Sequence, residues 1–176
     1  MSNITLYRHA LSGHSHRAQL LLSLLGLDAT LVAVDLAAGE HKQAAFLAKN
    51  RFGQVPVLED GAAVIADSNA ILVYLAKKYD ASHTWLPVDP LAAAEVQRFL
   101  STAAGQIASG PAAARLVNVF GAALDHQRAV AVAHNVLSVL ESHLDGREWL
   151  VGNNPTIADV ANYAYIAHAP EGYVSL

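Results

Sequence analysis

Residues 53–58 read Gly-Gln-Val-Pro-Val-Leu, and residues 67–71 read Asp-Ser-Asn-Ala-Ile. Because proline has no N–H to donate to a sheet, we expect Pro56 at the first residue of a strand, directly after a turn. A cis peptide bond before such a proline would leave the N–H and C=O of Val55 free to pair with an extended ligand backbone. Asp67 and Ser68 lie where a helix should begin, and unpaired N–H groups there attract a carboxylate. The two stretches predict a site for a peptide-like, acidic ligand.

The first half of the chain alternates between strand-like and helix-like patterns. We expect strands at residues 4–7, 30–34, 56–59 and 62–65, and helices at 15–26, 44–49 and 67–79. Asp60-Gly61 is a strong hairpin signal between the last two strands. A strand–helix–strand unit of this length implies a parallel pair with a right-handed crossover. The order βαβ followed by ββα predicts a thioredoxin-like α/β domain built on a small mixed sheet.

The second half of the chain shows no strand pattern and reads as helical. We expect a helix over 91–121 that kinks or breaks at Gly110-Pro111, then helices over 127–144 and 156–168. Thr156 and Asp159 have the spacing of a capping box, with Asp in place of Glu or Gln. The predicted organisation is a thioredoxin-like domain over 1–80, a polar linker over 81–89 and an all-helical domain over 90–176.

The composition excludes several kinds of function. The chain has 176 residues, 53% of them hydrophobic, a net charge of −4, no cysteine and nine histidines that form no metal motif. It is long enough to bury a real core, and it lacks the basic runs of a nucleic-acid-binding protein. It shows neither a signal peptide nor an apolar run that spans a bilayer. We therefore predict a cytoplasmic protein that binds no metal, nucleic acid or membrane. Without cysteine, any thiol chemistry must take its sulfur from a ligand.

Five motifs follow one another along the chain: Ile-Thr-Leu-Tyr at 4–7, Ser-Gly-His-Ser-His-Arg at 12–17, the stretches at 53–58 and 67–75, and Asn-Pro-Thr-Ile-Ala-Asp at 154–159. Their order resembles that of the cytosolic glutathione S-transferases, in particular the theta-like and beta-like bacterial types. The resemblance covers nearly the whole chain. Members of the family usually continue through one or two further helices. By resemblance, the helical domain of this chain therefore lacks its last helices.

The resemblance implies a transferase of the detoxification type, with glutathione as co-substrate. Such an enzyme binds glutathione, stabilises its thiolate and conjugates it to small apolar electrophiles. The resemblance also implies a homodimer, formed between the first domain of one subunit and the helical domain of the other. Two alternatives stay open from the sequence. One is a glutathione-dependent disulfide or peroxide reductase, and the other is a non-catalytic binding or assembly module on the same scaffold.

A thiol is a weak nucleophile at neutral pH because the thiolate is its reactive form. Lowering a thiol pKa by about two units takes about 2.7 kcal/mol. A charge-assisted hydrogen bond of about 1.5–3 kcal/mol, beside a helix N-terminus, supplies that preference. A hydroxyl just ahead of the first helix has the right chemistry. Ser12 is our first candidate, Ser15 at the expected helix start is the second, and Tyr7, by resemblance to classes with a catalytic tyrosine, is the third. Ser12 is equally well explained as a turn serine, and Ser15 as a plain N-cap.

The resemblance also assigns roles to the stretches at residues 53–58 and 67–71. By resemblance, Asp67 pairs with the ammonium group of the γ-glutamyl end of glutathione, and Ser68 binds its carboxylate at the helix N-terminus. Val55 and Pro56 then present the backbone that pairs with the ligand. The simpler explanation of Asp67 and Ser68 is an ordinary helix cap.

The resemblance extends to both ends of the ligand. His41 and Gln54 match positions that approach the glycine carboxylate in theta-like members, with Gln54 in place of a lysine. His14 stands where related sequences often have asparagine. We assign it to the electrophile site, and two readings stay open: it donates to the sulfur, or it faces solvent. Arg115 and Val119, on the first long helix of the second half, are predicted to face the electrophile.

Overall fold

The computed structural model describes residues 4–176, which form two compact units, and the chain passes from one to the other between Ser82 and His83. The first unit contains strands β1 (Ile4–Arg8), β2 (Thr30–Ala33), β3 (Val57–Asp60) and β4 (Ala63–Ala66), and helices α1 (Gly13–Leu24), α2 (Ala44–Leu47) and α3 (Ser68–Tyr79). A 3-10 turn at Glu40–Lys42 precedes α2. The element order confirms the predicted thioredoxin-like fold of this half.

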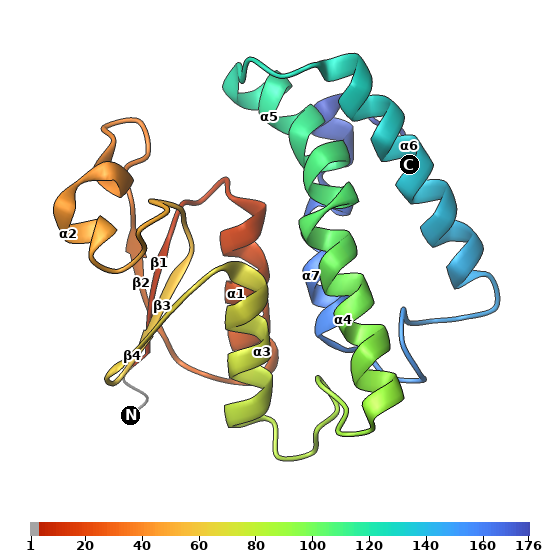
Figure 1. Ribbon diagram of the computed structural model, residues 1–176, viewed down its shortest axis with the longest axis horizontal. Coiled ribbons are helices and arrows are strands. Elements are labelled where there is room, and N and C mark those ends of the chain that lie inside the picture. The colour runs from red at the N-terminus through yellow and green to blue at the C-terminus, as the bar shows by residue number, and fades with distance from the viewer. Residues whose placement is uncertain (1–3) are drawn as a thin grey trace. The chain divides into compact units, whose positions relative to one another are not determined.

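The sheet has four strands in the order β2-β1-β3-β4, with β1 parallel to β2 and antiparallel to β3. Helices α1 and α3 lie on one face of the sheet and α2 lies on the other (Figure 1). Val57 packs with Phe46 of α2 on the α2 face. Because side chains alternate along a strand, the neighbouring pair Leu6 and Leu58 points to α1 and α3, where both are fully buried.

The peptide bond between Val55 and Pro56 is cis, and β3 begins directly after it at Val57. Pro56 is buried but stands just ahead of the ladder, where its missing N–H leaves no strand partner unpaired. The hairpin that follows differs by one residue from the prediction. Asp60 pairs with Ala63 inside the ladder, so the turn consists of Gly61 and Ala62 rather than Asp60 and Gly61.

The second unit is helical throughout the described residues. Its elements are α4 (Pro90–Ala104), a π-helical turn (Ala108–Ala112), α5 (Ala113–Phe120), α6 (His126–Leu144), α7 (Ile157–Ala167) and a 3-10 turn (Ala169–Gly172). The long helix predicted over 91–121 is broken, but it ends earlier than expected, with Gly105 capping α4. Gly110 lies inside the π-helical turn, where an added Cβ would come 2.8 Å from the backbone nitrogen of Ala133 on α6. The irregular turn therefore allows a close approach of α6.

The predicted capping box opens α7. Thr156 Oγ1 accepts a hydrogen bond from Ala158 N at 3.2 Å, and the Asp159 carboxylate accepts one from Thr156 N at 2.8 Å. Asp159 also accepts a hydrogen bond from Leu150 N at 2.9 Å. One carboxylate thus completes the helix start and holds the loop before it, which explains why Asp serves here as well as Glu or Gln.

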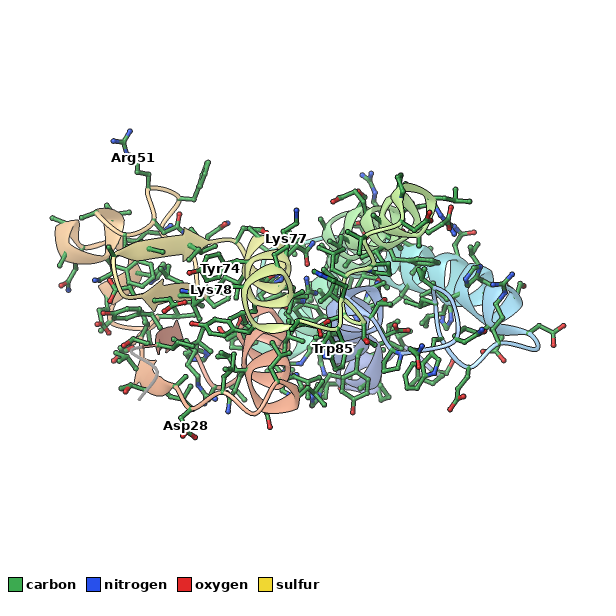
Figure 2. The ribbon with its side chains drawn as sticks, turned by 90° about the horizontal axis from the view of Figure 1, so that it is seen from below. Asp28, Arg51, Tyr74, Lys77, Lys78 and Trp85 are labelled. Atoms are coloured by element: carbon green, nitrogen blue, oxygen red, sulfur yellow. The ribbon has the colours of Figure 1, made fainter. Side chains whose placement is uncertain are left out.

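Asp60, the last residue of β3, fixes the hairpin to the C-terminal half of α3. Its Oδ2 accepts hydrogen bonds from Tyr74 Oη at 2.9 Å, Tyr79 Oη at 2.7 Å and Lys78 Nζ at 2.6 Å. Figure 2 shows Tyr74 and Lys78 on α3. Burial raises the pKa of the Asp60 carboxyl, but the hydrogen bonds from Lys78, Tyr79 and Tyr74 outweigh burial and hold that pKa below its usual value.

We expect Asp60→Ala to lower the free energy of unfolding by about 2 kcal/mol at pH 7, because hydrogen bonds to a charged group are worth about 1.5–3 kcal/mol. The folded pKa is depressed, so this contribution is present above the unfolded pKa of about 4 and is lost as the pH falls through the folded pKa. Urea denaturation at pH 7 and pH 3 measures both effects.

Glu95→Ala is the matched control, because Glu95 pairs with Arg98 on an exposed surface where ion pairs contribute little. It should change the free energy of unfolding by less than about 0.5 kcal/mol. An Asp60→Ala penalty of the same size at pH 3 and pH 7 would contradict the role given to the Asp60 carboxylate.

Candidate functional site

The N-terminus of α1 is capped by Ser12. Ser12 Oγ accepts a hydrogen bond from Ser15 N at 3.2 Å, and its carbonyl accepts one from His16 N at 2.9 Å. Ser12 is half-buried, and Gly13, the first residue of the helix, is buried. A hydroxyl that accepts a backbone hydrogen bond still has its own hydrogen to donate. Ser12 can therefore cap the helix and also donate to an anion in front of it.

The other two hydroxyls considered for the thiol lie elsewhere. Ser15 was expected at the helix start, but it lies inside the first turn of α1, is 1% exposed, and accepts a hydrogen bond from His9 N at 3.3 Å. The helix begins earlier than predicted because Ser12 is the better placed cap. Tyr7 packs edge-on against Phe46 on the α2 face of the sheet, and its hydroxyl donates to Glu59 Oε2 at 2.9 Å. Tyr7 thus points away from the face that carries α1.

The N-terminus of α3 is capped by Asp67, whose Oδ1 accepts a hydrogen bond from Ala70 N at 2.9 Å. Asp67 has φ 75° and ψ 128°, a backbone conformation that L residues rarely adopt. Such conformations cost about 1–3 kcal/mol and are concentrated at ligand clamps and active sites. Ser68, the first residue of the helix, is 4% exposed. The strained cap holds Ser68 and its N–H at the positive end of α3.

A buried arginine joins the two helix starts. Arg17 of α1 is 1% exposed, and its Nη1 donates to Asn69 Oδ1 at 2.9 Å and to Ser68 Oγ at 3.4 Å. Ser68 Oγ also lies 3.3 Å from His14 Nδ1. The first turns of α1 and α3 therefore come together around a cation. Two positive helix ends and a guanidinium favour a bound anion at this place.

His14 is held neutral in this surrounding. Burial, followed by the positive charge of Arg17, lowers the pKa of His14 to about 4, while the Asp67 carboxylate acts in the opposite direction. The ring is therefore uncharged at neutral pH and acts as a hydrogen-bonding group, with one nitrogen that donates and one that accepts.

The segment before Pro56 is tied to the 3-10 turn at Glu40–Lys42. Lys42 Nζ donates to Gly53 O at 3.1 Å, and Asn50 Nδ2 donates to Gln54 O at 2.8 Å. Gly53 has φ 58°, and an added Cβ would come 2.7 Å from His41 O, so only glycine allows this close approach. These contacts set His41 beside the residues that lead into the cis bond.

Polar groups in this segment lack partners among residues 4–176. His41 Nδ1 is buried and has no hydrogen-bond partner there. Val55 stands outside the ladder, and no backbone hydrogen bond is found for it in the same part of the chain. Gln54 is exposed. Because buried polar groups are nearly always paired, His41 Nδ1 and the Val55 backbone are suited to a peptide-like ligand.

The predicted electrophile residues of the second unit lie on α5. Arg115 is 6% exposed, and its Nε donates to Glu171 Oε2 at 2.6 Å, while its guanidinium lies 5.8 Å from the centre of the Phe120 ring. The carboxylate fixes this cation against the turn at Ala169–Gly172. Val119, by contrast, is 40% exposed, as is the neighbouring Phe120 at 44%. The exposed part of α5 is thus mostly apolar.

Sequence reasoning missed the importance of Arg17 and Asn69, whereas Lys42 was a candidate neighbour of His41 and Gln54 for the glycine carboxylate. An arginine just ahead of an apolar helical run, as in Arg17-Ala18-Gln19-Leu20-Leu21, is the one signal that the sequence offers for a buried cation. Its partners lie 51 and 52 residues away along the chain. The described residues contain no cluster of three or more His, Cys, Asp or Glu that could hold a metal ion, and over residues 4–176 no helix has the length and apolarity to cross a membrane.

Comparison with protein families gives two matches. Residues 2–77 match the family model described as "Glutathione S-transferase, N-terminal domain". Residues 116–172 match the model described as "Glutathione S-transferase, C-terminal domain". Together these matches cover most of the chain and include the starts of both α1 and α3.

Two curated relatives illustrate the similarity. Glutathione S-transferase 3 of Zea mays is 37% identical over 177 residues, covering 94% of this chain and 78% of the maize protein. Glutathione S-transferase theta-2 of Homo sapiens is 34% identical over 143 residues, covering 77% of this chain and 59% of the human protein. The chain therefore spans most of the maize protein but well under two thirds of the human one.

Solved structures agree with the sequence matches. The crystal structure of a glutathione S-transferase from Pseudomonas fluorescens superimposes with a TM-score of 0.92 at 31% identity, covering 98% of this chain and 87% of that one. A glutathione transferase homologue from Drosophila mojavensis, solved with bound glutathione, gives a TM-score of 0.86 at 28% identity, covering 95% and 77% of the two chains.

The lowered pKa of His14 makes stability depend on pH. Between the ordinary value of 6.5 and the folded value of about 4, the unfolded chain binds a proton that the folded chain does not. The stability gained by keeping the His14 ring neutral is therefore fully present above about pH 6.5 and is lost as the pH falls towards 4. Over that range, we expect the free energy of unfolding of the wild type to fall by about 2 kcal/mol more than that of His14→Asn.

Urea denaturation at several pH values measures this difference. His134→Asn is the matched control, because His134 is an exposed residue of α6, and it should keep the wild-type profile. If His14→Asn and the wild type lost stability in parallel between pH 6.5 and 4, the lowered pKa of His14 in the folded protein would be refuted.

Proposed function

The chain belongs to the glutathione S-transferase family and is accordingly a glutathione transferase, and we propose that it conjugates glutathione to small apolar electrophiles with Ser12 holding the thiolate. The observation that carries the proposal is the meeting of the starts of α1 and α3 around Arg17, which donates to Ser68 Oγ at 3.4 Å. One helix start then serves the sulfur, and the other serves a carboxylate of the same tripeptide.

The γ-glutamyl end of glutathione is assigned to α3. Its carboxylate would accept hydrogen bonds from the N–H and hydroxyl of Ser68, where the helix end and Arg17 favour an anion. Its ammonium group would pair with the exposed carboxylate of Asp67. The strained backbone of Asp67, with φ 75°, supports a role beyond capping.

The rest of the tripeptide is assigned to the segment around the cis bond. The N–H and C=O of Val55 would pair with the cysteinyl backbone, with Pro56 fixing the turn that exposes them. The glycine carboxylate would lie near His41 and Gln54. His41 Nδ1, a buried nitrogen without a partner among the described residues, supports this assignment. Neutral donors would hold this end of the ligand, because the nearby cation, Lys42 Nζ, already donates to Gly53 O at 3.1 Å.

The chemical step needs the thiolate, and the α1 start is suited to stabilising it. Ser12 would donate its hydroxyl hydrogen to the sulfur while its oxygen continues to accept from Ser15 N. A hydrogen bond to a charged acceptor and a helix N-terminus together contribute about 2–4 kcal/mol, enough to lower a thiol pKa by about two units. The sulfur then attacks the electrophilic carbon, an S–C bond forms, and the electron pair moves to the leaving group or to the activated double bond.

Two further properties are part of the proposal. Val119 of α5, 40% exposed, would contribute apolar surface to electrophile binding. The cytoplasm is the compartment we propose, because glutathione is kept largely reduced there. The net charge of −4 and the lack of a basic run in the sequence argue against a nucleic-acid partner.

Removing the Ser12 hydroxyl tests the proposal directly. We expect Ser12→Ala to lower kcat/KM for an aryl halide about 10- to 100-fold and to raise the pKa of bound glutathione by one to two units, since one hydrogen bond to an anion is lost. The thiolate absorbance of the binary complex, followed against pH, measures the pKa.

Two variants separate chemistry from helix capping. Ser12→Thr retains both the hydroxyl and the cap, so it should keep most of the activity. Ser15→Ala removes a buried hydroxyl of the same helix, so turnover by folded protein should stay within about threefold of the wild type. Undiminished turnover by Ser12→Ala would remove Ser12 from the thiolate role.

We also propose that the protein is a homodimer, as family membership suggests. Phe52, in the loop between α2 and β3, is 81% exposed, which is unusual for a large apolar side chain and supports a buried position in an assembly. Light scattering at micromolar concentration should give twice the mass of one chain, and Phe52→Asp should shift the equilibrium towards the monomer. A monodisperse monomer of the wild type would refute the dimer.

A further inference from the structure

Three side chains from α1 and α3 form a hydrogen-bonded row. Arg17 Nη1 lies 3.4 Å from Ser68 Oγ, and Ser68 Oγ lies 3.3 Å from His14 Nδ1. All three side chains are buried or half-buried. Ser68, the first residue of α3, is the middle member of the row, and the proposed function puts the γ-glutamyl carboxylate there.

Counting hydrogens favours one arrangement of this row without ligand. A guanidinium only donates, so Ser68 Oγ must accept from Arg17. Ser68 Oγ has a second lone pair, so its contact with His14 Nδ1 can run in either direction. Among residues 4–176, however, Nδ1 is the acceptor found for the Ser68 hydrogen, and it accepts only when it is unprotonated. Burial and Arg17 lower the pKa of His14 to about 4, so the ring is neutral and carries a single proton. In the ligand-free protein, we infer that this proton is on Nε2, which lets the Ser68 hydrogen reach Nδ1.

A carboxylate arriving at Ser68 changes this count. To bind it, the Ser68 hydroxyl must turn its hydrogen to the carboxylate, which leaves the lone pairs of Ser68 Oγ and His14 Nδ1 facing each other. Facing lone pairs within hydrogen-bond distance repel, and a buried unpaired acceptor costs about 1–3 kcal/mol. A proton on Nδ1 removes this cost, because Nδ1–H then donates to Ser68 Oγ.

We propose that binding of the γ-glutamyl carboxylate at Ser68 switches His14 from its Nε2–H tautomer to its Nδ1–H tautomer. The inference rests on the proposed function, since it takes Ser68 as the carboxylate site. One proton leaves Nε2 to solvent and one enters at Nδ1, so the ring stays neutral and no net proton is taken up. His14 is therefore a positioning residue that lets Ser68 act as a donor. Arg17 on α1 and Asp67 on α3 are the charged groups that act on it.

The tautomer is directly observable by NMR. In 15N-labelled protein, the pyridine-like ring nitrogen resonates well downfield of the N–H nitrogen, so the spectrum shows which one carries the proton. The chain has nine histidines, and the His14 signals are those absent from His14→Asn. We expect Nε2–H in the free protein and Nδ1–H at saturation with S-methylglutathione, which has the γ-glutamyl carboxylate but no free thiol.

Two controls identify the cause of the switch. The dipeptide cysteinylglycine lacks the γ-glutamyl residue and should leave the Nε2–H tautomer unchanged. Ser68→Ala should abolish the switch even at ligand saturation, because the hydroxyl that links the carboxylate to the ring is gone. A His14 tautomer that is the same in free and S-methylglutathione-bound wild type would overturn the inference.

Affinity gives a second readout. His14→Asn has an amide that can donate to Ser68 in the same way, so the Kd for S-methylglutathione should stay within about twofold of the wild type. His14→Leu has similar size but no donor, and its Kd should rise about five- to tenfold. Thermal melting establishes that each variant is folded. Equal affinity of the wild type and His14→Leu would overturn the inference and leave the glutathione site intact, whereas wild type that binds no glutathione would refute the proposed function itself.

Discussion

Arg17 carries a permanent positive charge and is 1% exposed, so the fold must surround it with oxygen atoms. Two of these come from α3, where Asn69 Oδ1 and Ser68 Oγ accept from its Nη1. A buried cation of this kind adds little net stability, but removing one of its partners strongly destabilises the fold. It thereby fixes the starts of α1 and α3 relative to each other. The oxygen partners named here are uncharged, so the positive charge remains and favours an anion at the start of α3.

Proline sets a second constraint, in the segment that leads into β3. Pro56 has no N–H, so β3 begins only at Val57, and the chain ahead of it stays out of the ladder. The loop that leads there is held by Lys42 and Asn50, which bond the carbonyls of Gly53 and Gln54. Its geometry is therefore defined even though it belongs to no strand. A backbone that is fixed but unpaired is what an extended peptide can bind.

Most of the fold could be predicted from local patterns, because they reflect which side of an element is buried. The alternation in β1 and the apolar positions of α3 gave the right elements. The errors fall where local signals compete. The hairpin shifted by one residue because Asp60 is held in the ladder by Tyr74, Tyr79 and Lys78, donors far away in the sequence. The helix over 91–121 ends at Gly105 rather than at Gly110-Pro111, because a π-helical turn accommodates the proline and brings Gly110 against α6.

The candidate site shows why a residue type can be read from sequence while its pairing cannot. Ser12 and Ser68 were both recognisable, since each stands at the start of a helix. The contact between the two helix starts was not recognisable, because His14 and Ser68 are 54 residues apart and meet only when α1 packs on α3. The observed capping role of Ser12 is compatible with the predicted role as a hydrogen-bond donor. A capping serine accepts a backbone hydrogen bond with an oxygen lone pair and keeps its own hydrogen. The same hydroxyl can therefore donate that hydrogen to an anion in front of the helix.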